Sequence, residues 1–216
     1  MVIEKAVKPR ASRKCANLFF DSCLFANSRL IIFLFTHLPN HSITKLFAAF
    51  VVKLIVPMNT ECNRIAYALA SAINGDAWYG DSLRKILDNV TAEQAKARPI
   101  PNAHSIWELV LHVEVWVKFC VGAVQGTPIP PWSTMPREQD WPPVGDTGEQ
   151  TWKQAVSSFF STHLSLVEAL KTLSDDRLET TVPGRTYNFY HLFQGMIQHA
   201  VYHGGQIALL KKTAGA

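Results

Sequence analysis

The apolar residues from Met58 onward recur at helical intervals in four separate stretches of the chain. A period of 3.6 residues places these side chains on one face of a helix, where they can meet a common core. No stretch shows a convincing strand pattern. The sequence therefore predicts an all-α fold, a four-helix bundle. Its helices are expected at about residues 60–90, 105–122, 149–173 and 187–213.

Local signals mark where the first two helices begin. Asn59 or Thr60 can cap the first helix, which "NGD" (74–76) interrupts before it resumes. In "SIWE", Ser105 and Glu108 stand three residues apart and fit a capping box at the start of the second helix.

A long connection separates the second helix from the third. Residues 126–148, "GTPIPPWSTMPREQDWPPVGDTG", are rich in Pro, Gly and Trp and have no helical or strand period. A loop of this length inside a compact domain is usually a lid, a binding loop or a clasp. Trp132 and Trp141 could roof an apolar pocket, pin the loop or form a dimer surface, and all three readings stay open.

Residues 1–57 differ from the rest of the chain. Their apolar runs, "LIIFLF" and "LFAAFVVKLIVP", are shorter than the roughly 18 residues that span a bilayer. Three interpretations remain: a targeting or membrane-touching extension, an ordered extra element, or an upstream segment wrongly included in the reading frame. The third is favoured because Met58 directly precedes a capped helix. The sequence thus predicts a poorly ordered extension over 1–57 and one helical domain over 58–216.

Charge and cysteine content narrow the class of protein. Since the whole chain carries +4 and residues 1–57 carry +6, residues 58–216 carry −2. A slightly acidic domain offers no basic surface for nucleic acid, and for 58–216 no membrane partner is expected. The four cysteines form no C-x-x-C pair, which is typical of a reducing compartment, so the protein is expected in the cytoplasm.

Histidines carry the candidate chemistry. In "HAVYHGGQIALLKK" (199–212), His199 and His203 stand four residues apart and share one helix face, so they can hold one transition metal. His112, in the apolar stretch "ELVLHVEVW", is the best third ligand. Three neutral imidazoles leave a coordination position for water or substrate. The alternative is a set of buried histidines whose nitrogens bind backbone or carboxylate groups.

Residues beside the histidine pair are candidates for the surroundings of the site. An interior glycine costs a helix about 1 kcal/mol relative to alanine, so Gly205, with Gly204 as a second candidate, is expected to let another helix or a substrate approach, or to serve helix packing alone. Gln206 lies on the side of His203 and could hydrogen-bond a ligand or a group next to the ligands of the metal. His104 is either a residue of the cap region or a pocket group. His163 and His191 are not expected to bind the metal.

"HSIWELVLHVEVW" (104–116), followed by "HAVYHGGQIALLKK" (199–212), resembles the DinB/YfiT-like family of metalloenzymes. The resemblance extends from Met58 to the C terminus. It implies a four-helix bundle in which His112, His199 and His203 bind a divalent metal, which could be zinc, nickel or ferrous iron. Ala200 departs from an acidic residue found in many relatives, so a role for that carboxylate is not expected here.

The same resemblance implies the candidate function. Members of the family include transferases and isomerases that use low-molecular-weight thiols, and a metal can lower the pKa of such a thiol. The leading hypothesis is a divalent-metal enzyme of this kind acting on a small molecule. A metal-assisted hydrolase and a non-catalytic metal-binding or stress-response bundle are the alternatives. The resemblance also implies a homodimer.

Overall fold

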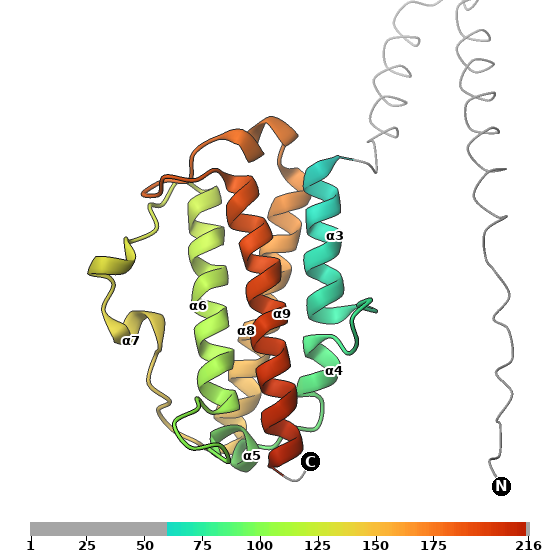
Figure 1. The fold of residues 1–216 in the computed structure, drawn as a ribbon, viewed down its shortest axis with the longest axis vertical. Helices are drawn as coiled ribbons and strands as arrows, with labels where there is room; N and C mark the ends of the chain where they lie inside the picture. The colour runs from blue at the N-terminus through green and yellow to red at the C-terminus, as the bar shows by residue number, and fades with distance from the viewer. Residues whose placement is uncertain (1–59, 215–216) are drawn as a thin grey trace, which may run out of the picture. The chain divides into compact units, whose positions relative to one another are not determined.

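In the computed structural model, which describes residues 60–214, the regular elements of that range are all helices (Figure 1). The all-α prediction is confirmed, whereas the predictions for residues 1–57 lie outside the described part of the chain. The four longest helices are α3 (Glu61–Asn74), α6 (Ile106–Val124), α8 (Glu149–Thr172) and α9 (Phe189–Thr213). The shorter elements are α4 (Leu83–Leu87), α5 (Ala92–Lys96), α7 (Arg137–Asp140) and two 3-10 turns, Trp132–Thr134 and Asp175–Glu179.

The four long helices lie side by side around one apolar core. Helices α3 and α6 each pack against both α8 and α9 (Figure 1). This pattern puts α8 and α9 at opposite corners of the group, so their inward side chains face each other across the core. The largest fully buried side chains are Trp107, Trp152, Phe159, Phe189 and Phe193. None of the described helices is both long and apolar enough to cross a bilayer.

Helix ends follow the local signals closely where those signals are strong. Helix α3 is capped by Thr60, and Ser105 and Glu108 form both hydrogen bonds of the expected capping box at α6. The first helix was expected to resume over a longer stretch than α4 covers. Helix α4 ends because Asp88 has an extended ψ of 134°, and Asn89 then takes φ 59°. Helix α5 was not expected, because five residues are too few for a period to be recognised.

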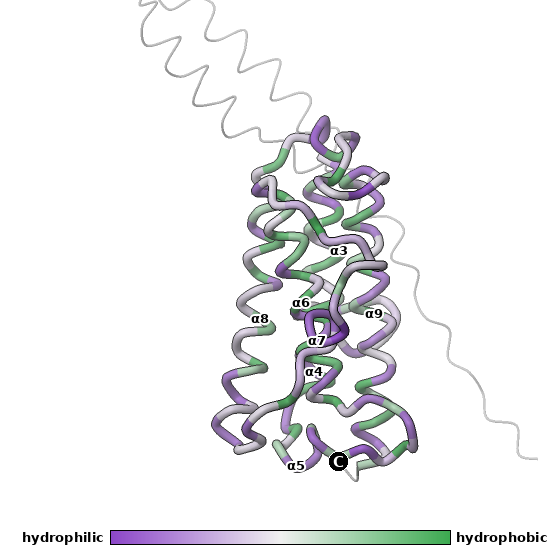
Figure 2. Tube along the Cα trace, turned by 90° about the vertical axis from the view of Figure 1, so that its left-hand side faces the viewer, coloured by the Kyte–Doolittle hydropathy of each residue, from purple (hydrophilic) through white to green (hydrophobic). Residues whose placement is uncertain are grey.

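The connection between α6 and α8 is more ordered than its composition indicates. It contains one 3-10 turn and helix α7, where the sequence indicated no regular element. Figure 2 shows it passing along the outside of the bundle, with α7 at about mid-height. Helix α7 is therefore held against the flank of the bundle.

The start of this connection is fixed by a second loop. The buried Ile129 donates its N–H to the carbonyl of Pro183 at 3.0 Å, and the Arg185 guanidinium donates to the carbonyl of Pro130 at 2.6 Å. Gly184 has φ +76°, and a Cβ there would lie 2.7 Å from the carbonyl oxygen of Ile129. Only glycine fits this contact between the two loops.

Ser105→Ala is expected to lower the free energy of unfolding by about 1 kcal/mol, because it leaves a backbone N–H of the first turn of α6 without its acceptor. Urea unfolding of the full chain measures this change. Ser82→Ala is the matched control: Ser82 precedes α4 without a side-chain cap, and its buried hydroxyl has no partner. Equal losses in both variants would contradict the role assigned to the Ser105 cap.

Candidate metal centre

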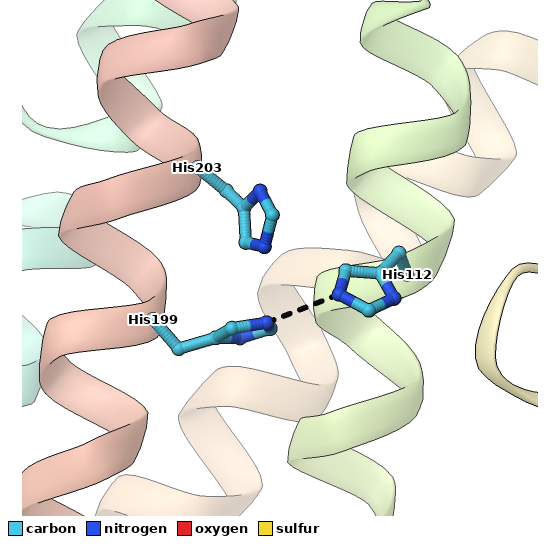
Figure 3. A group of neighbouring side chains, drawn as sticks. All are labelled: His112, His199 and His203. Carbon is cyan, nitrogen blue, oxygen red and sulfur yellow. Dashed lines mark hydrogen bonds between the residues drawn. The ribbon is translucent and has the colours of Figure 1, made fainter. Parts of the chain in front are cut away.

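Three imidazoles from two helices meet where α6 and α9 pack against each other. His199 and His203 lie on successive turns of α9, and His112 faces them from α6 (Figure 3). The nitrogens that they offer lie within 4.8 Å of one another, and the Nε2 atoms of His112 and His199 are 3.1 Å apart. The structure thus brings together the three residues singled out in the sequence.

The outer nitrogen of His112 is held by the connection between α6 and α8. Its Nδ1–H faces two oxygens of Asp140: the backbone carbonyl at 2.8 Å and the carboxylate Oδ1 at 3.2 Å. The same Oδ1 accepts a hydrogen bond of 2.8 Å from the indole N–H of Trp116. Because Nδ1 is the donor, the Nε2 of His112 presents its lone pair to the other two imidazoles.

The outer nitrogen of His203 is held by its own helix. Nδ1 lies 2.7 Å from Oε1 of Gln206, an acceptor, so this nitrogen carries the proton. The Nε2 of His203 is then also a free lone pair. Gln206 therefore hydrogen-bonds one of the candidate metal ligands. This is one of the two roles that its spacing from His203 allowed.

The donor set suits a transition-metal ion. Tetrahedral coordination at metal–nitrogen distances of about 2.0–2.1 Å places ligand nitrogens about 3.3–3.4 Å apart, close to the 3.1 Å between His112 and His199. Without a metal, His199 donates its Nε2–H to the lone pair of His112. On metal binding His199 must carry its proton on Nδ1 instead. Three histidines within reach of one ion, two of them already in the binding tautomer, fit a metal site.

Trp141 forms one wall of this site. Its indole stacks on His112 at 3.8 Å between ring centroids and on His104 at 3.6 Å, both nearly parallel. Two rings cannot share one face of an indole at these distances, so Trp141 lies between the two imidazoles. His104 therefore supports the wall and does not reach the other histidines. Trp132, the other tryptophan considered for a pocket roof, is 61% exposed, and its ring tilts against Trp116.

Burial keeps the three imidazoles neutral. Desolvation lowers the pKa of His112 and of His203 below the ordinary value, although Asp140 and Gln206 act in the opposite direction. Desolvation, together with the neighbouring imidazoles, lowers the pKa of His199 to about 3. Neutral imidazoles are the form that binds metals.

The two glycines of the last helix play different parts. Gly204 is buried, and a Cβ there would lie 3.5 Å from a methyl group of Leu83, so α4 approaches α9 at this point. A Cβ at Gly205 would have no atom within 4 Å. Of the two glycines considered for the close approach of a helix, Gly204 is the one beside another helix.

Three further polar residues of α6, α8 and α9 differ in their burial. Glu114, only 4% exposed, lies between α6 and α8, where it accepts hydrogen bonds from Ser158 and Thr162 and pairs with Lys118. His163 is buried in α8. His191, at the start of α9, is exposed.

Sequence reasoning did not identify Asp140 as a partner of the site. It lies 28 residues from His112, in a segment without a period. The dipeptide Asp140–Trp141 in an otherwise Pro-rich loop was the available signal, and the sequence prediction named only Trp141.

The fold and the site define a class: an all-α protein with a candidate three-histidine metal centre. A sequence model of the DinB superfamily matches residues 77–207, and the chain belongs to this superfamily. The match includes all three histidines. Neither the comparison with curated proteins nor the comparison with solved structures gave a match.

The metal-free protein is expected to lose stability as the pH falls. Burial lowers the pKa of His163 to about 4, whereas the unfolded chain takes up this proton near pH 6.5. The unfolded state therefore binds more protons below that pH, and the loss begins there and continues down to about pH 4. Between about pH 7.5 and pH 5, His163 alone contributes a loss of about 2 kcal/mol. Urea unfolding at pH 7.5 and at pH 5, with a chelator present, measures this loss of unfolding free energy.

The matched pair for this measurement is His163→Leu and His191→Gln. The leucine variant should show a smaller loss on acidification, whereas the variant at the exposed His191 should behave like the wild type. A pH dependence that is the same in all three proteins would contradict the assignment to His163.

Asp140→Asn is expected to weaken zinc binding by about 10–100-fold, because an amide stabilises a metal-bound imidazole less than a carboxylate does. The backbone carbonyl of Asp140 remains, so the ring of His112 keeps one acceptor. Competition with a chromophoric chelator measures the affinity. Glu138→Gln, an exposed change of the same kind in α7, should leave it unchanged.

Proposed function

We propose that this protein is a divalent-metal enzyme that activates a low-molecular-weight thiol for transfer to, or isomerisation of, a small molecule. The observation that carries the proposal is the convergence of His112, His199 and His203 with their Nε2 atoms turned toward one another. Membership of the DinB superfamily supports metal binding at this place. Zinc, nickel and ferrous iron all accept imidazole ligands.

In such a site, different residues of the chain would bind the ion and orient its ligands. His112, His199 and His203 would hold the ion, while Asp140 and Gln206 keep two of these rings in the binding tautomer. When bound, the ion supplies a Lewis acid that lowers the pKa of a thiol or a water beside it. Three protein ligands leave room for that molecule.

The described cysteines argue for a thiol from outside the chain. Cys62 and Cys120 are buried, and burial raises the pKa of the Cys62 thiol to about 11 and also raises that of Cys120. Neither forms a thiolate near neutral pH, so neither is suited to act as the nucleophile. A small-molecule thiol at the open position would meet this need. The cytoplasm, where such thiols stay reduced, and the homodimer both stay predictions.

Metal analysis by mass spectrometry of the full chain tests the foundation of the proposal. One divalent ion per chain is expected, and His203→Ala should lose it because the variant keeps only two of the three ligands. His191→Ala, an exposed histidine of the same helix, should keep it. Equal metal content in the His203 and His191 variants would place the ion elsewhere.

Turnover of small electrophiles, with and without glutathione or cysteine, tests the chemistry. The proposal expects turnover that needs both the metal and the thiol, and that His199→Ala abolishes. Turnover that needs the metal but no thiol would identify a hydrolase. A metal-loaded protein that binds neither thiol nor electrophile would indicate a non-catalytic bundle.

A further inference from the structure

His163 is a buried histidine that the metal site as described does not use. It lies in α8 and is 1% exposed. Its Nδ1 is 2.7 Å from the carbonyl oxygen of Phe159, which only accepts, so Nδ1 carries the proton. The Nε2 of His163 is therefore a lone pair. It is buried and has no hydrogen-bond partner among the described residues.

His199 differs from the other two candidate ligands in the same respect. His112 and His203 have acceptors for their outer nitrogens, Asp140 and Gln206. The Nδ1 of His199 is buried and has no partner among residues 60–214. Leaving a buried polar atom unpaired costs about 1–3 kcal/mol. With a metal on Nε2, this Nδ1 becomes a donor, and it then needs an acceptor.

The fold places these two unpaired nitrogens on helices that face each other. Helices α8 and α9 occupy opposite corners around α6, and α8 passes behind the three imidazoles in Figure 3. His163 is also among the groups that lower the pKa of His199, although burial, His203 and His112 contribute more. No direct hydrogen bond joins His163 to His199.

We propose that one buried water links the Nδ1 of His199 to the Nε2 of His163, and that His163 is a positioning residue of the metal site. The inference rests on the proposed function, because it concerns the metal-bound form of His199. A water has two hydrogens and two lone pairs, so it satisfies both states of the site. In the metal-free protein it donates to both nitrogens. In the metal-bound protein it accepts from the Nδ1–H of His199 and still donates to His163.

This link completes the set of outer partners. Each of the three imidazoles then has its outer nitrogen held by a different part of the fold: Asp140 of the α6–α8 connection, Gln206 of α9 and His163 of α8. Such partners orient metal-binding imidazoles and raise their affinity for the ion. His163 also stabilises the Nδ1–H tautomer that His199 needs in order to bind.

Two substitutions in the full chain separate a positioning role from simple packing. His163→Leu fills the space without an acceptor, whereas His163→Gln keeps an oxygen near the place of Nε2. Zinc affinity, measured by chelator competition at neutral pH, should fall about 10–100-fold in the leucine variant and stay close to wild type in the glutamine variant. Thermal unfolding of the metal-free forms serves as the control, and the leucine variant should be no less stable than the glutamine variant.

Two results would overturn the inference: wild-type zinc affinity in His163→Leu, or an equal loss in both variants. A second measurement needs no substitution, so it tests the inference even if a variant does not fold. The ¹⁵N spectrum of histidines in the zinc-loaded wild type should show His163 protonated on Nδ1 only, and a proton on Nε2 would overturn the proposal. A wild-type chain that takes up no zinc would overturn the proposed function itself, a different and recognisable outcome.

Discussion

A buried imidazole must place each of its nitrogens either against a partner or against a ligand, and the centre of this protein is arranged around that requirement. Three such rings meet where α6 and α9 pack together, and their inner nitrogens converge. Water could satisfy them at a surface, but at this depth desolvation keeps them neutral. Neutral imidazole nitrogens in an apolar core are stable only when hydrogen bonds or a metal ion satisfy their lone pairs.

The long connection between α6 and α8 supplies contacts that orient His112 within the site. It descends along the flank of the bundle and brings Asp140 and Trp141 against His112, one as a hydrogen-bond acceptor and the other as a stacked wall. Gly184 lets the neighbouring loop press against its start. A segment without helical or strand pattern therefore determines the orientation and tautomer of a candidate ligand.

Helix α6 carries buried polar groups on two sides. His112 faces α9, and Glu114, about 200° further round the helix, faces α8 and accepts from Ser158 and Thr162. If α8 moved by one turn along α6, the carboxylate would lose these donors while remaining buried. The Glu114 contacts thus fix the height of α8 beside α6. That height also determines where His163 stands relative to His199.

The sequence by itself determined the helical class, the ends of the long helices and the three histidines, because these follow from local rules. Apolar spacing, the Ser105–Glu108 box and the four-residue step from His199 to His203 involve neighbours along one helix. Only the tertiary structure decided that Asp140 would hold His112, which of the two glycines would lie beside another helix, and that His163 would be buried with a free nitrogen. Each of these depends on how separate helices and an aperiodic loop pack together, and no local spacing encodes that packing.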